Sequence, residues 1–503
     1  MVSAMKTSHV MIVALALAAP TMANAQGNLQ SDAEAAHYVQ RIESLDDAGP
    51  QINAVIVFDR DATAKAGAAM RGNTRLNGRT VLVKDNIETS EWATTAGSLA
   101  LKDNRTGRDA PMITNLRAAG GVVLGKTNLS EWANIRDNSS TSGWSAVGGL
   151  TRNPHGIDRN TCGSSSGSGA AIAAGFAWAA IGTETDGSIT CPASVNGVVG
   201  FKPTVGMISR THVVPISHSQ DTAGPMARSV QDAAMLLTAL AGSDPADPAT
   251  AEADARKTDF SAGLGNSTLQ GVRIGVLRKQ VGNRGDVRTL FDTALADMVR
   301  AGAVLVDIDF EPNGEMYRDE YAVLLFELRE DMGTYLRSLP GADMPRSLSD
   351  LIAFNEANSA AEMRWFGQSI FLEAEAATDR SAYEKARANA LKLAGAEGID
   401  RLLAENEVAF LVAPTTGPAW VSDLVNGDHF SGGIGAGSLA AIAGYPHLTV
   451  PMGAVEGLPV GLSIMSGKWR DHDVLKAGAA YERARTAALP EPSLARWQPA
   501  PAE

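Results

Sequence analysis

Apolar residues along this chain alternate between the spacing of a helix and the spacing of a strand. Over residues 31–47 they recur on one side of a helix, at Ala35, Tyr38, Ile42 and Leu45. The later segments with such spacing are a short helix ITNLRAAG at 113–120, a strand GVVLGKT at 121–127, strands VRIGVL at 272–277 and AVLVDIDF at 303–310, and a helix around 288–301. Helices that alternate with strands predict an α/β fold.

A second region has helical spacing throughout. Residues 316–394 are predicted to be largely helical. Among the large apolar residues of this region are Trp365, Phe366, Phe371 and Leu372. Core packing is the default expectation for such aromatic side chains. Glycine and proline residues over 417–437 predict a loop, of the kind that lies near the mouth of a cavity.

Two glycine-rich turns carry closely spaced serines. They are CGSSSGSG at 162–169 and GTETDGSITCPAS at 182–194. Ser164 and Ser188 are 24 positions apart, and the segment 167–182 between them predicts an Ala/Gly helix followed by the start of a strand. A turn, a helix and a returning strand can bring both serines to one point.

The glycines of these turns permit close approaches of the backbone. Gly187 allows a tight turn directly before Ser188, and the first turn has the same freedom at its own glycines. Those glycines are Gly163, Gly167 and Gly169. A turn of this kind can direct several N–H groups at one spot and so form an oxyanion hole. The alternative interpretation of either turn alone is a flexible loop.

Lys84 lies upstream, in the segment VLVKDN at 81–86. A serine nucleophile can be activated by a second serine and a lysine, without a histidine. The lysine must then be neutral, so burial or another cation has to lower its pKa from about 10.4. The apolar residues before Lys84 predict a buried strand that delivers it, whereas an ordinary lysine at the end of a strand lies on the surface.

With these three segments in place, the chain resembles the amidase signature hydrolases. Their core motif is close to GGSSGG…GTDxGGSI, with an upstream lysine in a KDN-type segment. Further matches are GKTNLSEWA at 125–133, RNP at 152–154, GVVGFKPTVG at 197–206, DTAGPMARSVQDAA at 221–234, LVAPTT at 411–416 and AGYPHLTVPMG at 443–453. The resemblance covers about residues 30–485. It implies one large α/β domain, with a mixed central β-sheet covered by helices on both faces.

The resemblance also assigns roles to residues. Ser188 corresponds to the acylated nucleophile, Ser164 to the proton relay and Lys84 to the base. The peptide bond before the relay serine, from Gly163 to Ser164, is expected to be cis. The corresponding oxyanion-hole donors are the backbone N–H groups of Thr185, Asp186, Gly187 and Ser188. Residues 316–394 usually form the wall of the substrate cavity in this family.

Some positions depart from the general pattern of the family. The glycine pair before the nucleophile is Asp186 and Gly187 here, the usual acidic Asp is Glu184, a common arginine is Thr190, and NGRTVLVKDN lacks the usual GxP element. Several segments are most similar to those of bacterial peptide amidases, which release ammonia from the C-terminal carboxamide of peptides. These segments are TETDGSI with CPA, SEWAN, SGWSAVGG, CGSSSGS and SQDTAGPMARS. Asp186 is expected to bind substrate, either by repelling a free carboxylate or by accepting a hydrogen bond from the amide NH₂. A local turn acceptor is the alternative role.

Other activities remain in view at this point. An acylamidase or a carbamate or anilide hydrolase would use the same three residues, and only the leaving-group pocket distinguishes it. An exported peptide-binding protein would not need Lys84, Ser164 and Ser188. A glutamine-tRNA amidotransferase is disfavoured by the export signal at the N-terminus.

That signal occupies residues 1–25. Lys6 is followed by an apolar run over residues 10–19 and by the small-residue pattern at Ala23 and Ala25. Cleavage after Ala25 would leave 26–503 as the catalytic domain. No later segment offers 18 uninterrupted apolar residues, so no membrane span is expected and the enzyme is predicted to be periplasmic or secreted.

Composition adds three expectations. The net charge of −13 argues against nucleic acid or an anionic membrane as a partner. The eight histidines lack ligand spacing, so neither a metal nor another cofactor is predicted. Cys162 and Cys191 each lie near one of the serines. Because a chain of this size does not need a disulfide, two buried free thiols are favoured over a bridge, although the convergence of the serines would bring the sulfurs together.

Overall fold

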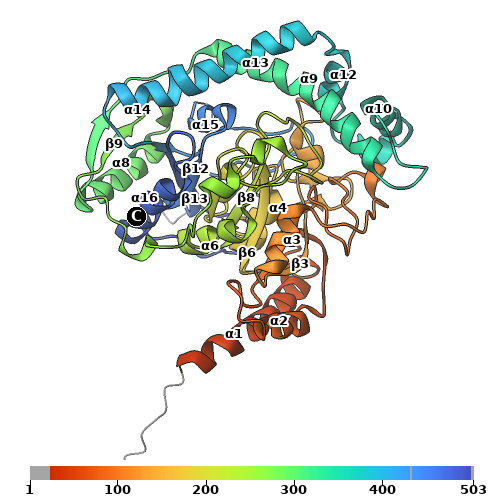
Figure 1. Cartoon of the computed structure of the whole chain (residues 1–503), viewed down its shortest axis with the longest axis horizontal. Coiled ribbons are helices and arrows are strands. Elements are labelled where there is room, and N and C mark those ends of the chain that lie inside the picture. Colours follow the sequence, from red (N-terminus) through yellow and green to blue (C-terminus); the bar gives the residue numbers. More distant parts are fainter. Residues whose placement is uncertain (1–22, 431–432, 500–503) are drawn as a thin grey trace, which may run out of the picture.

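A mixed sheet of eleven strands forms the centre of the protein, in the order β1-β3-β2-β6-β8-β7-β12-β13-β11-β9-β10 (Figure 1). The computed structural model describes residues 23–430 and 433–499. The strands are β1 Val55–Phe58, β2 Thr80–Lys84, β3 Val122–Thr127, β6 Ala179–Glu184, β7 Val199–Lys202, β8 Thr222–Ala227, β9 Arg273–Val276, β10 Val304–Asp307, β11 Phe410–Pro414, β12 His447–Val455 and β13 Leu458–Met465. A separate pair is β4 Trp144–Ser145 and β5 Gly149–Leu150.

Both strand directions occur within this sheet. β2 runs parallel to its neighbours β3 and β6, and β9 runs parallel to β10 and β11. The strands between these two groups pair antiparallel. The mixed α/β fold is therefore confirmed.

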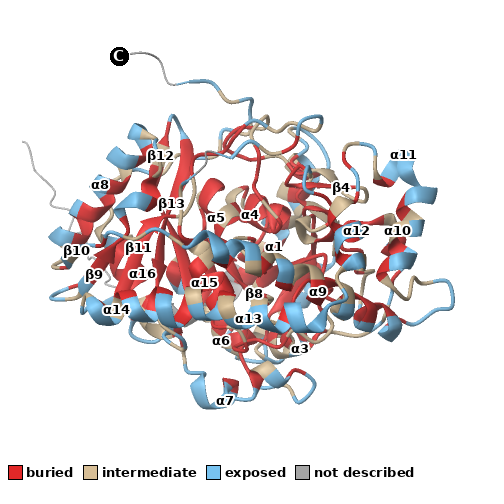
Figure 2. Cartoon of the chain, turned by 90° about the horizontal axis from the view of Figure 1, so that it is seen from above, coloured by how far each residue is buried: buried red, intermediate tan, exposed pale blue. Residues whose placement is uncertain are grey.

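The helices surround the sheet (Figure 2). They are α1 Ala23–Arg41, α2 Ala62–Met70, α3 Pro111–Ala118, α4 Ser166–Ala173, α5 Thr190–Val195, α6 Val230–Leu240, α7 Ala253–Arg256, α8 Gly285–Arg300, α9 Gly314–Ser338, α10 Leu348–Ala357, α11 Ser359–Glu362, α12 Ser369–Ala376, α13 Arg380–Ala394, α14 Arg401–Glu405, α15 Gly437–Ala443 and α16 Asp471–Ala484. The predicted helix at 31–47 is the second half of α1 together with a π-helical turn at Ile42–Asp46. The predicted signal segment lies almost entirely in residues 1–22, outside the described residues.

Helices cover both faces of the sheet, as the side chains of β12 demonstrate. Leu448 lies against Gly478 of α16. The next residue, Thr449, lies on the side of Ser194 of α5, whose hydroxyl accepts a hydrogen bond from Gly461 N in β13. Because successive residues of a strand point to opposite faces, α16 and α5 cover opposite faces.

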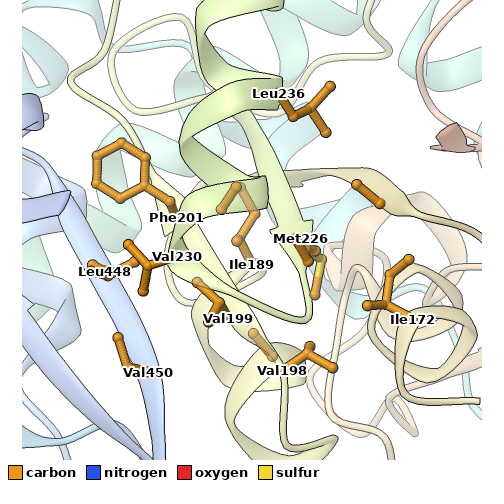
Figure 3. Close-up of a cluster of buried hydrophobic side chains, with 14 of the residues drawn as sticks. Ile172, Ile189, Val198, Val199, Phe201, Met226, Val230, Leu236, Leu448 and Val450 are labelled. Atoms are coloured by element: carbon orange, nitrogen blue, oxygen red, sulfur yellow. The ribbon is translucent and has the colours of Figure 1, made fainter. Parts of the chain in front are cut away.

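The core beneath the two serine-rich turns is apolar. Figure 3 shows Ile189, Val199, Phe201, Met226 and Leu448 in one cluster. Ile189, which follows Ser188, is fully buried in this cluster. The burial of each such side chain contributes roughly 1.5–3 kcal/mol, so this packing fixes the backbone that carries Ser188.

The helical region predicted at 316–394 is confirmed as α9 to α13, which lie along one edge of the molecule (Figure 1). Phe366 and Phe371 are buried against Trp144 and Trp132, with ring centroids 5.2 and 5.8 Å apart. Leu372 is 52% exposed, because it lies on the outer side of the short helix α12 whose inner side holds Phe371.

Candidate active site

Lys84 is the last residue of β2, and its side chain is fully buried. Its Nζ lies 2.8 Å from Ser164 Oγ, 2.8 Å from Thr183 Oγ1 and 3.2 Å from Thr183 O. Thr183 belongs to β6, the strand beside β2, so the sheet itself holds the lysine against the first serine-rich turn. The predicted buried strand is confirmed.

The surroundings of Lys84 favour its neutral form. Burial lowers the pKa of Lys84 to about 7, against the opposing effects of Asp221 and Glu184. A neutral amine has two N–H donors and one lone pair. Two donors satisfy the two oxygen atoms of Thr183, which leaves the lone pair for the hydroxyl proton of Ser164. The contact therefore lets a neutral Lys84 accept the hydroxyl proton of Ser164.

The two serine-rich turns meet, as their spacing predicts. Ser165 N donates to Ser188 O at 3.1 Å. The bond between Gly163 and Ser164 is cis, as the resemblance implies. A Cβ at residue 163 would overlap the hydroxyl of Ser130, so any larger residue would have to displace that hydroxyl. Within the described residues, Ser188 Oγ forms no hydrogen bond and faces a cavity.

Residues 185–188 form a loop with unused backbone donors. The N–H groups of these four residues donate no hydrogen bond to any of the described residues. Gly187 has a φ of +78°, which favours glycine. Glu184 Oε2 accepts from Ile189 N at 2.7 Å and from Thr190 N at 3.0 Å, so the chain directly after Ser188 is fixed. The loop therefore has two features of an oxyanion hole: the residues that follow it are fixed, and its backbone N–H groups are free to bind a negative oxygen.

The expectation of two free thiols is wrong. Cys162 and Cys191 form a disulfide, with their Cα atoms 6.0 Å apart. Chain length was the wrong criterion, because the bridge joins the two serine-rich turns where they converge. Both cysteines line the cavity, so the covalent link lies at the site itself.

The cavity has a volume of about 570 Å³. Ser188 and the 185–188 loop line it together with Tyr317 and Leu324 of α9, so α9 supplies part of the wall, as the resemblance implies. Phe430 and Ile434 line it from the loop between β11 and α15, which confirms the predicted loop near the cavity. This volume matches the range of small-ligand sites, about 300–1,000 Å³.

Asp186 lies half-buried in the wall of the cavity, two residues before Ser188. Its carboxyl group hydrogen bonds with the side chains of Ser438 in α15 and Glu320 in α9. Burial raises the pKa of Asp186 to about 6, and Ser438 opposes this effect. The side chain therefore joins the loop to two helices, rather than serving as a local turn acceptor.

Sequence reasoning missed Glu320, Gln220 and Asp221. Asp221 Oδ1 accepts from Thr185 Oγ1 at 2.6 Å, and Gln220 Nε2 donates to Thr185 O at 3.3 Å. Gln220 and Asp221 both lie in the matched segment SQDTAGPMARS, which is the signal in the sequence that could have found them. Glu320 lies in a helix without a motif, so only the three-dimensional structure reveals it.

One histidine has two carboxylates as neighbours. Among the described residues, ligand atoms of His218, Glu327 and Asp331 lie within 4.8 Å of one another. His218 Nδ1 lies 2.9 Å from Asp331 Oδ2, and Tyr383 OH donates to Glu327 at 2.6 Å. Arg387 adds a cation 3.8 Å from Glu327, so protein groups already satisfy these carboxylates, and we assign no metal to this cluster.

No helix in the described part of the chain is long and apolar enough to cross a bilayer.

Comparisons with known proteins place the chain among amidases. The family model described as Amidase matches residues 35–475. The crystal structure of native peptide amidase from Stenotrophomonas maltophilia is 47% identical, with a TM-score of 0.87 over 93% of this chain and 97% of that chain. A structure of the peptide amidase PAM with the competitive inhibitor chymostatin is 48% identical, with a TM-score of 0.89 and the same coverage. A protein named as a probable amidase of Arabidopsis thaliana is 37% identical over 461 residues, 88% of this chain and 85% of that protein.

Proposed function

The chain belongs to the amidase family and is a hydrolase of amide bonds, and from that premise we propose that it removes the C-terminal carboxamide of peptides as ammonia. The observation that carries the proposal is the contact of the buried Lys84 with Ser164 beside Ser188, in a cavity with free N–H groups. Similarity to peptide amidases over 93% of the chain supports the substrate class.

In the proposed mechanism, Ser188 Oγ attacks the carbonyl carbon of the carboxamide. Its proton passes to Ser164, whose own proton passes to the neutral Lys84. The negative oxygen of the tetrahedral intermediate accepts hydrogen bonds from the N–H groups of residues 185–188. The C–N bond then breaks, the nitrogen takes the proton back from Lys84 through Ser164, and ammonia leaves. Water hydrolyses the acyl ester by the same proton route, which restores Ser188 and releases the free carboxylic acid.

Selectivity is proposed to follow from the shape and charge beside Ser188. A pocket that accepts NH₂ but excludes a further residue spares internal peptide bonds. Asp186 adds negative charge in the wall of this pocket, which disfavours a free C-terminal carboxylate.

Ammonia release from amidated peptides tests this function. The panel contains amidated peptides, the matched free-acid peptides and the matched anilides. We expect turnover of the amidated peptides, loss of that turnover in Ser188→Ala, and wild-type turnover in Ser139→Ala, which removes an exposed serine. Faster cleavage of the anilides would assign an acylamidase instead, and binding without turnover would assign a peptide-binding protein.

Labelling identifies the nucleophile in the same preparations. An acylating serine reagent should modify Ser188, as mass spectrometry of the digested protein would report. Modification of Ser164 or Ser165 in place of Ser188 would reverse the assignment of the nucleophile and the relay.

Export is part of the proposal and has its own test. Expression of the full chain in a bacterium should yield an enzyme in the periplasm or medium that begins at Gln26. A cytoplasmic enzyme that retains Met1 would contradict the signal-peptide interpretation.

A further inference from the structure

Two carboxyl groups, those of Asp186 and Glu320, meet at the 185–188 loop. Glu320 in α9 is 6% exposed, and its side chain hydrogen bonds with that of Asp186. Two ionised carboxylates have only acceptors, so a hydrogen bond between them requires a proton on one of them. The pair therefore holds one proton whenever it is intact.

Glu320 reaches the loop by a second route. Gln220 Nε2 donates to Glu320 Oε1 at 2.9 Å and also to Thr185 O at 3.3 Å. Glu320 is thus connected to both of the first two residues of the loop, directly to Asp186 and through Gln220 to Thr185. The loop ends at Ser188, whose hydroxyl lines the cavity.

The direction of the free N–H groups in this loop depends on such contacts. None of residues 185–188 donates a backbone hydrogen bond within the described chain, and the carbonyl groups of Gly187 and Ser188 accept from Cys191 N and Ser165 N. The first half of the loop is held by its side chains. Thr185 and Asp186 are the residues whose side chains are tied, through Asp221, Glu320 and Ser438. A displacement of these side chains would move the donors, and oxyanion stabilisation requires donors about 2.7–3.1 Å from the negative oxygen.

We propose that Glu320, as a protonated carboxylic acid, is a positioning residue that holds the 185–188 loop in its catalytic conformation. It donates its proton to Asp186 and accepts from Gln220. The inference rests on the proposed function, since it assigns the loop to the oxyanion of amide hydrolysis.

The other charged and titratable groups around the pair are Glu184, Lys202 in β7 and Tyr317 in α9. Burial, and then the charge of Asp186, raise the pKa of Glu320 well above its usual range. Lys202 is the neighbouring cation that favours the ionised form of Asp186. Loss of the shared proton at high pH leaves the carboxylate of the buried Glu320 in contact with that of the half-buried Asp186, and the two repel each other and displace the loop.

The test compares Glu320→Gln with Glu320→Leu in the full-length enzyme, with an amidated peptide as substrate. In Glu320→Gln the amide NH₂ donates to Asp186 and the amide oxygen accepts from Gln220, without a titratable proton. Glu320→Leu removes both contacts. Glu330→Gln, an exposed position of the same helix, is the matched control.

We expect Glu320→Leu to lower kcat by about tenfold or more with little change in KM. This loss should be smaller than the roughly hundredfold or larger loss of kcat that follows deletion of an oxyanion donor. The wild type should lose kcat at alkaline pH, whereas Glu320→Gln should keep most of the activity at neutral pH and should not show this alkaline fall. Glu330→Gln should keep both the activity and the alkaline fall.

Three results would overturn the inference. They are an unchanged kcat in Glu320→Leu, an alkaline fall of wild-type size in Glu320→Gln, and equal losses in both variants at neutral pH. If Glu320→Leu does not fold, the pH profile of Glu320→Gln decides alone. A wild type that releases no ammonia rejects the proposed function, whereas an active wild type with unaffected Glu320 variants rejects only this inference.

Discussion

Two buried lysines on neighbouring strands differ in the charge of their partners. Lys84 ends β2, and Lys126 lies beside it in β3, paired in register with Val83. Both side chains are fully buried. Lys126 Nζ lies 3.1 Å from Asp85 Oδ1, and it also donates to Ile87 O at 2.7 Å. The hydrogen-bond partners of Lys84 are all uncharged, two oxygens of Thr183 and the hydroxyl of Ser164.

This difference separates a structural lysine from the proposed base. Burial lowers the pKa of both lysines, and a carboxylate in contact opposes this effect for Lys126. The contact with Asp85 favours the charged form of Lys126 as part of an ion pair. Among the described residues, no carboxylate forms an ion pair with Lys84, so Lys84 can lose its proton near neutral pH and accept one from Ser164. Burial alone does not make a lysine a base, because an anion in contact would stabilise its charged form.

The largest effect is expected from Lys84→Met, which removes the base and keeps the apolar stem. General-base catalysis contributes about 10²–10⁴-fold, so kcat should fall by that order while the melting temperature stays close to that of the wild type. Steady-state kinetics and thermal unfolding measure the two quantities. Lys84→Arg should be equally inactive, because arginine keeps its charge. Near-normal activity of either variant would show that another group is the base.

The same substitution at the neighbouring lysine should act on stability instead. Lys126→Met leaves Asp85 buried without its cation, which should cost about 3–5 kcal/mol of unfolding free energy. Denaturant unfolding measures the loss, and the double variant with Asp85→Asn should recover part of it. Wild-type stability of Lys126→Met would mean that Asp85 is not charged in the folded protein, and the contrast between the lysines would fail.

The smallest effect concerns selectivity rather than the base. Asp186→Gly introduces the glycine that the wider family has at this position. The substitution should change the kcat/KM ratio of a peptide amide to its anilide by about tenfold in favour of the anilide. Lys84→Met should lower both rates and leave that ratio unchanged. An unchanged ratio in a folded Asp186→Gly enzyme would assign selectivity to other walls of the cavity.

Local patterns predicted the parts of the site that are local in sequence. The strand before Lys84, the turns around Ser164 and Ser188 and the helix and strand between them all follow from short-range spacing. The missed parts depend on contacts between distant segments. Glu320 reaches the loop from α9, more than a hundred residues later, and the pairing of Cys162 with Cys191 depends on how the two turns meet. Exposure of Leu372 likewise depends on which side of α12 faces the fold.

The measurement that tests the central claim most directly is the pH dependence of Ser188 acylation by a serine reagent. Acylation reports the nucleophile and its base, without product release. If neutral Lys84 is the base, the rate should rise with pH along a limb with an apparent pKa of about 7. Lys84→Met should lack this limb, and Lys126→Arg, which keeps its charge beside Asp85, should retain it. A wild-type rate that is independent of pH across this range, or a limb near the ordinary lysine pKa of about 10.4, would contradict the account.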